Sequence, residues 1–260
     1  MTTSYPNQNL IQPENNPALH WQEWLKTAIL LLMGVYFIWL IGSGKLSNYI
    51  NLRFQWLTVV AIILFFLPGI WSLVRLIRGA RGIQQAQTSF AHNPVTWQSM
   101  GIVAIPLILA LVVPSQPLGA DAVSGGVSLN AVGGESSLVT YEQNPLQRNI
   151  LDWLREFDRA DNPALFNRQE IRVSGFVYRE IGMTDNQFMV ARFTMSCCVA
   201  DAFAIGIPVE MDNAADFEDG VWVEVEGTLE AGQFVDRNTP IIQPDNITPI
   251  EMPDNPYLYS

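Results

Sequence analysis

The sequence predicts two parts of different class: an α-helical membrane segment with three transmembrane helices, and an all-β C-terminal domain folded as an OB-like five-stranded barrel preceded by an amphipathic helix. Long uncharged stretches fill much of the first half, whereas in the second half the hydrophobic period changes from 3.6 to 2 residues. The charges divide in the same way. Residues 1–119 contain six Lys/Arg and two Asp/Glu, and residues 120–260 contain eight Arg, no Lys and 23 Asp/Glu.

The membrane helices are predicted from their length and from the aromatic residues at their ends. A helix needs about 20 apolar residues to cross a bilayer. Two uncharged stretches meet this requirement and have Trp near their ends, as is typical of membrane interfaces; buried helices of a soluble protein are the alternative. A third stretch contains Pro106, and its strongly apolar part is short, so a re-entrant or interfacial helix is the alternative to a third span. The predicted helices lie at about residues 27–44, 54–74 and 97–117, within a membrane region of residues 25–118 that follows a polar tail of residues 1–24.

The positive-inside tendency predicts on which side of the membrane each loop lies. Arg75, Arg78 and Arg81 lie between the second and third predicted helices without any acidic residue, so this connection is expected in the cytoplasm. An odd number of spans then places the C-terminal domain outside the cytoplasm. The sequence therefore predicts a multi-pass protein of the cell (inner) membrane with an extracytoplasmic domain.

Between the helices and the barrel, residues 119–143 are rich in Gly, Ala and Ser and predict a flexible tether. The soluble domain is predicted over residues 144–260. Asn144 and Pro145 suit the start of a helix, which is expected to end before Pro163. The apolar residues of this helix recur at helical spacing and are expected to dock on the domain: Leu146, Ile150, Trp153, Leu154 and Phe157.

Five short strands are predicted in the rest of the domain, with a short helical segment at about residues 213–219 between the third and fourth. This order matches an OB-type barrel, and a small sandwich is the alternative. Gly175 and Gly227 fit the bends that a barrel needs, and Pro244 suggests that the fifth strand lies at an edge. The predicted strands are residues 171–178, 188–195, 204–210, 221–228 and 240–250.

The composition excludes several functions of the acidic domain. Nucleic-acid affinity depends on Lys and Arg that displace counterions, so a domain with this excess of acid is a poor polyanion binder. Both histidines, His20 and His92, lie outside the domain, which excludes Ser-His-Asp and Cys-His catalytic groups within it. Two cysteines exclude a disulfide framework and a four-thiolate zinc site.

The adjacent cysteines are the chemically unusual feature of the chain. Neighbouring residues of a strand point to opposite faces, so Cys197 and Cys198 converge only if the chain bends after the second strand. There both thiolates, with Asp201, could hold a thiophilic ion such as zinc or copper, with a fourth ligand from water, substrate, Asp185, Glu180 or a partner. The alternatives are two small buried side chains and a redox pair that forms a vicinal disulfide.

The residues also carry a family resemblance. The segments Gly175–Glu180, Ala191–Ala202, Trp222–Leu229 and Asn255–Tyr259 resemble the YcgQ-like proteins, which have N-terminal spans and a C-terminal domain with an RF…CC…DA signature. The resemblance covers essentially the whole chain. It implies partnership with a polytopic permease of the YcgR type, related to organoarsenical exporters, and a link to metal homeostasis. The motif positions carried over are Arg192, Cys197, Cys198 and Asp201.

From these observations we expect a non-enzymatic accessory subunit of a membrane permease, which presents its thiol pair to a metal or metalloid outside the cytoplasm. The alternatives are a membrane-tethered thiol oxidoreductase and a purely structural assembly factor. Arg192 is expected to neutralise a nearby acid such as Asp201 rather than to contact substrate.

Overall fold

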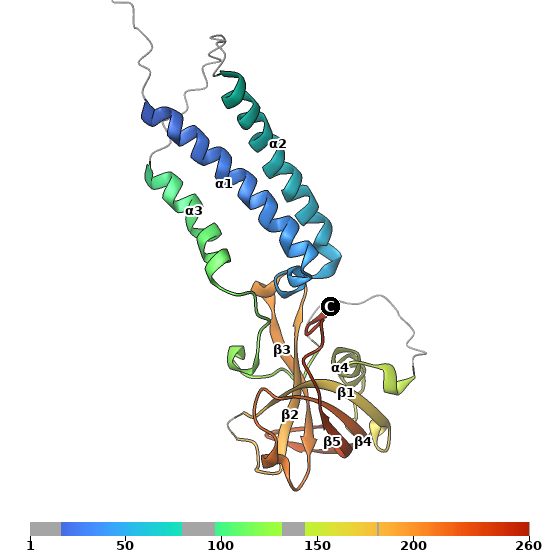
Figure 1. Cartoon of the computed structure of the whole chain (residues 1–260). Coiled ribbons are helices and arrows are strands. Elements are labelled where there is room, and N and C mark those ends of the chain that lie inside the picture. Colours follow the sequence, from blue (N-terminus) through green and yellow to red (C-terminus); the bar gives the residue numbers. More distant parts are fainter. Residues whose placement is uncertain (1–16, 80–96, 132–143, 181, 260) are drawn as a thin grey trace, which may run out of the picture. The chain divides into compact units, whose positions relative to one another are not determined.

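The structure is a computed structural model that describes residues 17–79, 97–131, 144–180 and 182–259. The chain divides into two compact units. The helical unit contains residues up to 43 together with residues 56–114, and the barrel unit contains residues 44–55 and 115–260. Figure 1 shows the elements of both units.

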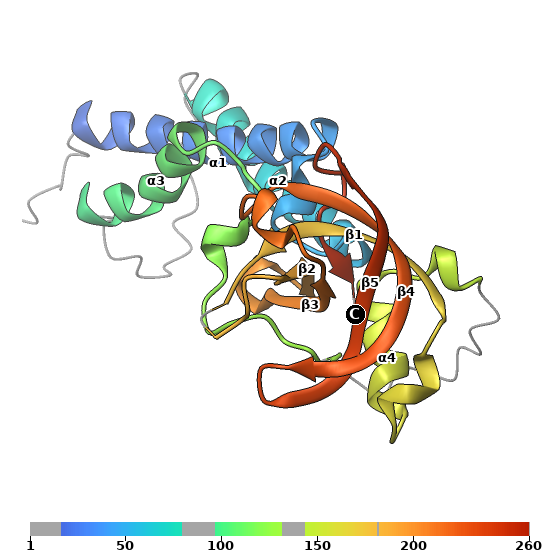
Figure 2. The ribbon, with the colours of Figure 1, turned by 90° about the horizontal axis from the view of Figure 1, so that it is seen from below.

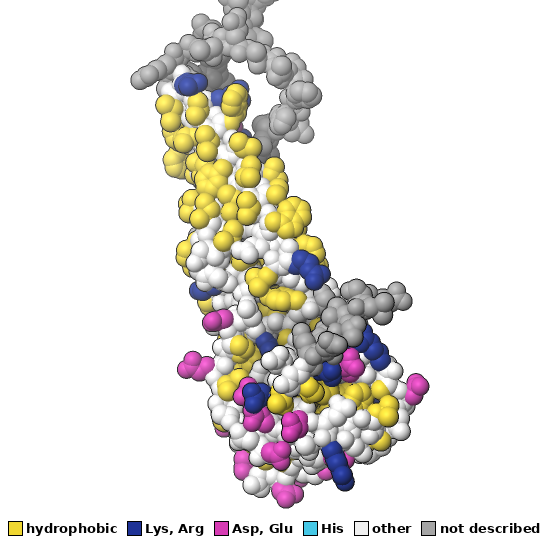
Figure 3. Space-filling model, turned by 90° about the vertical axis from the view of Figure 1, so that its right-hand side faces the viewer, with side chains coloured by type: hydrophobic (Ala, Val, Ile, Leu, Met, Phe, Trp, Pro, Cys, Tyr) yellow, Lys and Arg dark blue, Asp and Glu magenta, His cyan; other side chains and the backbone are white. Residues whose placement is uncertain are grey.

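The helical unit consists of three apolar helices: α1 (Pro17–Gly42), α2 (Gln55–Gly79) and α3 (Trp97–Val112). Helices α1 and α2 pack closely, because Gly34 of α1 lies against the ring of Phe66. A hydrogen bond of 2.7 Å joins the Thr27 and Ser72 hydroxyls across the same interface. Hydrophobic side chains cover much of the surface of this unit (Figure 3), including Trp71, which is 68 % exposed.

Two of the three predicted spans are long and apolar enough to cross a membrane, at Trp21–Gly42 and Leu52–Arg78. The third helix, α3, is shorter than predicted. It has 16 residues, which gives a length of about 24 Å at 1.5 Å per residue, and Pro114 follows soon after its end. Helix α2 extends beyond the predicted end at residue 74 and includes Arg75 and Arg78, whereas residues 80–96, with Arg81, lie outside the described residues.

The barrel unit contains a six-stranded sheet whose first five strands close into a barrel. Its strand order is β1-β4-β5-β3-β2, and a further β1–β2 pairing closes it. The pairing of β3 with β5 is parallel, at Val209 and Ile242. This is the Greek-key order of an OB-type barrel, which Figure 2 shows from one end. The strands are β1 (Glu170–Tyr178), β2 (Gln187–Met195), β3 (Phe203–Glu210), β4 (Trp222–Phe234), β5 (Arg237–Pro249) and β6 (Leu258–Tyr259).

Helix α4 (Ile150–Arg159) lies before the barrel and contributes to its core. It begins later than predicted, because Asn149 and not Asn144 is its N-cap: Asn149 and Asp152 exchange side-chain and backbone hydrogen bonds in a capping box. Asn144 and Pro145 begin a separate 3-10 turn instead. The buried Ile150, Trp153 and Leu154 join the strand residues of the main hydrophobic core.

Two predicted features of the barrel take a different form in the structure. Pro244 does not place β5 at an edge, because β5 lies between β4 and β3; Pro244 faces Gly227 at a bulge, where a Cβ on Gly227 would collide with the β5 backbone. The helical segment predicted between β3 and β4 is a single 3-10 turn, Ala214–Asp216.

The expected tether contacts the barrel over its described part. Immediately before it, the backbone N–H of Leu118 donates a hydrogen bond of 2.8 Å to the Tyr257 hydroxyl. Val127 is buried in the second hydrophobic cluster, and Ser128 forms a parallel bridge with Ile205 of β3. Residues 115–131 are thus part of the barrel unit, and the rest of the predicted tether, residues 132–143, lies outside the described residues.

Candidate functional site

The two cysteines lie in the loop between β2 and β3. Strand β2 ends at Met195, and the bend that follows brings both thiols to one side, so the Sγ atoms of Cys197 and Cys198 are 3.7 Å apart. Cys197 is exposed and Cys198 is half-buried. The expected convergence of the two side chains after the strand is therefore present.

Asp201 stabilises the loop of residues 196–201, the cysteine loop, of which it is itself a member. It lies at the end of a 3-10 turn, Val199–Asp201, and its carboxylate accepts hydrogen bonds from the backbone N–H groups of Ser196 (3.0 Å) and Cys197 (2.8 Å). These two donors satisfy the carboxylate with backbone groups of the same loop. Asp201 is thus a structural anchor of the loop as well as a neighbour of the thiols.

The same carboxylate controls the ionisation of the thiol. The hydrogen bond with Asp201 is the largest cause of a rise in the pKa of Cys197 to about 11, and the Cys198 thiol contributes to it. In turn, the thiol hydrogen bond lowers the pKa of Asp201. At neutral pH the site therefore contains a protonated Cys197 thiol beside an ionised carboxylate, which is the reverse of an activated nucleophile.

A second segment of the barrel unit holds the cysteine loop from outside. Residues 44–55, which connect α1 to α2 in the sequence, form a helix-connecting loop that contacts the cysteine loop directly. The backbone N–H of Asn51 donates to the Cys197 carbonyl (3.0 Å), and the Val199 N–H donates to the Tyr49 carbonyl (2.9 Å). These bonds flank an antiparallel bridge between Ile50 and Cys198.

Asn51 is the most deeply placed polar residue of this contact. It is 2 % exposed, and its side-chain amide donates to the Ser196 carbonyl (2.9 Å) and accepts from the Arg53 N–H (2.9 Å). Sequence reasoning missed this contact, because nothing in the local pattern of residues 44–55 indicates a partner about 145 positions away.

Arg192 does not neutralise Asp201 as expected. Its guanidinium donates hydrogen bonds from Nε to the Pro256 carbonyl (3.1 Å) and from a terminal nitrogen to the Asn255 carbonyl. Its Cζ lies 5.5 Å from the centroid of the Trp222 ring, and burial lowers its pKa to about 10. Arg192 therefore holds the C-terminal tail, and it is not the counter-ion of Asp201.

The three candidate ligand residues lie close enough to share one ion. The thiols of Cys197 and Cys198 and a carboxylate oxygen of Asp201 all lie within 4.8 Å of one another. Two thiolates bound to a tetrahedral zinc ion at about 2.3 Å are about 3.8 Å apart, close to the observed 3.7 Å. The site offers three ligands on an exposed loop, so a fourth position would stay open to water or to an incoming ligand.

Two other residues considered as the fourth ligand lie elsewhere. Glu180 and Asp185 precede β2, whereas the cysteines follow it. Strand β2 has nine residues, which corresponds to about 30 Å at 3.3 Å per residue. Both carboxylates are therefore at the opposite end of this strand from the thiols, and the prediction that either completes the site is wrong.

Comparison with known proteins places the chain in a family. Residues 25–126 match the DUF1980 N-terminal domain and residues 145–260 match the DUF1980 C-terminal domain. The chain is 25 % identical to UPF0703 protein YcgQ of Bacillus subtilis (strain 168), over 89 % of this chain and 98 % of the relative. It is 23 % identical to the "Putative two-component membrane permease complex subunit" of Streptococcus mutans serotype c (strain ATCC 700610 / UA159), over 88 % of this chain and 97 % of the relative.

Among solved structures, the small single-stranded DNA-binding protein from Streptomyces coelicolor matches 33 % of this chain and 94 % of its own, at 15 % identity and a TM-score of 0.23. The two relatives match most of the sequence, 88 % or more of this chain. With both of its domains matched in order and the expected resemblance confirmed, the chain belongs to the DUF1980 family.

Proposed function

We propose that this chain is a non-enzymatic accessory subunit of a membrane permease, with three helices in the cell membrane and the barrel outside the cytoplasm. The name of the Streptococcus mutans relative, a putative membrane permease complex subunit, supports the partner. The membrane topology that we propose is supported by the contact between the helix-connecting loop and the cysteine loop. A polytopic permease of the YcgR type, as the family resemblance implies, is the partner that we propose.

This contact supports an odd number of spans. The helix-connecting loop, residues 44–55, and the barrel belong to one compact unit, so they lie on the same side of the membrane. If α1 and α2 each cross the bilayer, the chain leaves α2 on the opposite side and must cross once more to reach the barrel. Helix α3 is the apolar helix in the intervening stretch, and a helix of about 24 Å can span a hydrocarbon core of about 30 Å when the bilayer thins locally.

The orientation rests on the charges at the helix ends. Arg75 and Arg78 lie at the end of α2, and the positive-inside tendency assigns this end to the cytoplasm. The loop of residues 44–55 and the barrel are then outside. The acidic surface of the barrel, visible in Figure 3 as scattered Asp and Glu side chains, agrees with a domain that does not contact anionic lipid.

For the thiol pair we propose a role as a ligand for zinc, copper or another thiophilic metal or metalloid. Three features support it: two sulfurs at a chelating separation, a carboxylate beside them and an exposed Cys197. The thiol oxidoreductase alternative requires a thiol that ionises readily. The pKa of Cys197 is raised to about 11 by the Asp201 hydrogen bond, which opposes that alternative.

The topology can be tested with the native thiols, because the chain contains only two cysteines. Spheroplasts that express the full chain are treated with a membrane-impermeant maleimide before and after permeabilisation. We expect labelling of the cysteine loop in intact spheroplasts. A variant with both cysteines replaced by Ser and with Ser89→Cys, which lies in the connection after α2, should be labelled only after permeabilisation. The reverse pattern would refute the proposed orientation.

The ligand role needs a separate test. The full chain, purified in detergent, is loaded with Zn²⁺ or Cu⁺, desalted and analysed for bound metal. We expect about one ion per chain, and its loss in the Cys197→Ser/Cys198→Ser variant but not in the Asp254→Asn control, which changes an exposed carboxylate in the C-terminal tail. Equal metal content in both variants would eliminate the ligand role and leave the assembly factor as the better description.

A further inference from the structure

The residues proposed to hold an ion at the thiol site are also the residues that bind the helix-connecting loop. The Cys197 carbonyl accepts the Asn51 N–H (3.0 Å), and Cys198 forms the antiparallel bridge with Ile50. Directly before the two cysteines, the Ser196 carbonyl accepts the Asn51 side-chain amide (2.9 Å). A change in the backbone of the two ligand residues therefore changes the surface to which the helix-connecting loop is bound.

Hydrogen bonds, and not the hydrophobic core, attach the helix-connecting loop to the barrel. Among the described residues of the barrel, neither hydrophobic cluster includes a member of residues 44–55. The bridge between Ile50 and Cys198 is isolated and lacks the neighbouring pairs of a ladder. Segments with few core contacts open at a lower free energy than core strands do. We therefore expect this contact to open without unfolding of the barrel.

An ion at the thiol site would restrict the same backbone. Cysteines bind metals as thiolates, so two protons pass from the thiols to the solvent when a divalent ion such as Zn²⁺ binds. The ion would join both sulfurs to a carboxylate oxygen of Asp201, and these three atoms lie within 4.8 Å of one another. Asp201 also accepts the Cys197 backbone N–H (2.8 Å). Ion binding therefore favours the ordered cysteine loop, which is the conformation that the helix-connecting loop contacts.

We propose that ion binding at the thiol pair and docking of the helix-connecting loop stabilise each other. This inference rests on the ligand role proposed above for the thiols. Helix α1 ends at Gly42 and α2 begins at Gln55, so the docked loop is covalently continuous with both helices. Occupancy of the thiol site then determines how firmly the connection between two membrane helices is held. Linkage is reciprocal, so docking raises the ion affinity by the same factor by which the ion favours docking.

The first test is hydrogen exchange of the full chain in detergent, with Zn²⁺ at about 100 times its dissociation constant or with a chelator instead. The N–H groups of Asn51 and Val199 report on the contact, because each donates a hydrogen bond across it. An ion that binds only the closed state slows exchange by up to about 100-fold at this concentration. We expect slowing of about tenfold or more at both positions, and none in the Cys197→Ser/Cys198→Ser variant.

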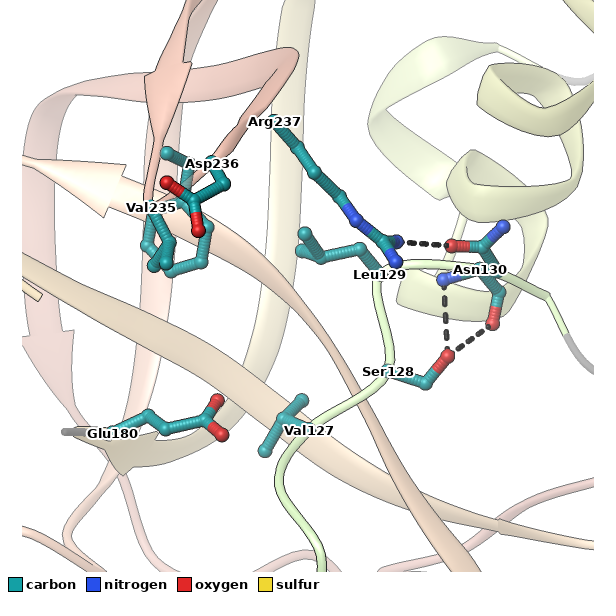
Figure 4. A pocket seen from close by; sticks show the side chains of 9 residues that line it. Val127, Ser128, Leu129, Asn130, Glu180, Val235, Asp236 and Arg237 are labelled. Carbon is teal, nitrogen blue, oxygen red and sulfur yellow. Dashed lines mark hydrogen bonds between the residues drawn. The ribbon is translucent and has the colours of Figure 1, made fainter. Parts of the chain in front are cut away.

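A remote part of the barrel provides an internal control for this measurement. Residues 234–237 of the β4–β5 hairpin line a cavity of about 590 Å³ together with residues 127–130 and Glu180 (Figure 4). Glu180 precedes β2, whereas the cysteines follow it. The Arg237 guanidinium donates a hydrogen bond of 3.2 Å to the Asn130 side chain within this group. Exchange in the hairpin should not depend on Zn²⁺, and equal slowing there would show general stabilisation and overturn the proposal.

The second test measures the reverse effect, as Zn²⁺ affinity in competition with a chromophoric chelator. Asn51→Ala removes the buried amide donor and should weaken the affinity by about fivefold or more, the lower end of typical couplings. Asn51→Ser keeps an oxygen that can accept the Arg53 N–H and should have the same effect with less loss of stability. Two controls should bind as the native chain does: Asn48→Ala, which removes a donor to Ser115 in the same loop, and Asp245→Asn, which changes an exposed carboxylate of β5.

The outcomes distinguish this inference from the ligand role on which it rests. If Zn²⁺ binds but exchange at Asn51 and Val199 is unchanged, docking and ion binding are independent, and only the inference is wrong. Native affinity in both Asn51 variants, or an equal loss of affinity in Asn48→Ala, would overturn it in the same way. If the native chain binds no ion, the ligand role is wrong and the inference is refuted with it.

Discussion

Replacing Asp201 by Asn should make the Cys197 thiol more reactive. The carboxylate is the largest cause of the rise in the Cys197 pKa to about 11, and an amide has no charge to oppose the thiolate. If the pKa falls by about two units toward the ordinary value of about 8.5, the thiolate fraction at pH 8 rises about 100-fold. Nucleophilicity falls with pKa at a Brønsted slope of about 0.5, so about tenfold of that gain remains.

The assay is the rate of alkylation by iodoacetamide at pH 8, measured on the full chain in a Cys198→Ser background so that one thiol reacts. We expect Asp201→Asn to react between about threefold and tenfold faster than its parent, because the exposed position of Cys197 weakens the electrostatic effect. The Asp245→Asn control should react at the parental rate. If the Asp201→Asn rate is unchanged while the thermal unfolding midpoint is retained, the carboxylate does not control the thiol.

Three further predictions concern the framework of the site. Asn51→Ala removes a buried amide that donates to Ser196 and should cost about 1–3 kcal/mol, seen as faster hydrogen exchange in the cysteine loop; unchanged exchange would show that the contact is weak. Gly227→Ala places a Cβ against the β5 backbone and should destabilise the barrel by about 1–3 kcal/mol or more, whereas Gly232→Ala meets only a flexible side chain and should cost less in the same denaturant titration. Asp201 has a pKa that is lowered, first by the thiol hydrogen bond, so its contribution to stability should be present at neutral pH and lost as the pH falls below about 3.9. The native chain and Asp201→Asn should therefore diverge in stability between pH 3 and 7, and parallel curves would contradict this.

Strands β1 and β4 could be predicted from the sequence because much of each is buried on one face only. Alternation places Ile171, Val173 and Val177 inside, and all three are buried in β1. The extension of β4 to Phe234 was missed, since the connecting turn at Val235 and Asp236 lacks the Asn-Gly or Asp-Gly signal of a two-residue hairpin. A turn that uses a β-branched residue at positive φ leaves no sequence signature.

Only the local part of the candidate site could be predicted from the sequence. The convergence of Cys197 and Cys198 follows from a local bend, and local geometry can be argued from neighbouring residues. The contacts of Asn51 and Arg192 join segments that are far apart in the sequence, at separations of about 145 and 64 positions. Such pairings depend on how the barrel closes and on where the helix-connecting loop lies, and one sequence contains no local pattern that specifies either.

The contacts of the four motif residues distinguish those that stabilise the loop from the two cysteines. Arg192 holds the C-terminal tail, and Asp201 accepts the backbone N–H groups of the cysteine loop, so each has a structural task that explains its residue type. If the cysteines only filled space, they would be buried, as free cysteine usually is. Cys197 is exposed instead, with its Sγ beside that of Cys198. The loop therefore leaves the Cys197 thiol exposed beside that of Cys198. This arrangement favours a ligand for the two sulfurs over a packing role.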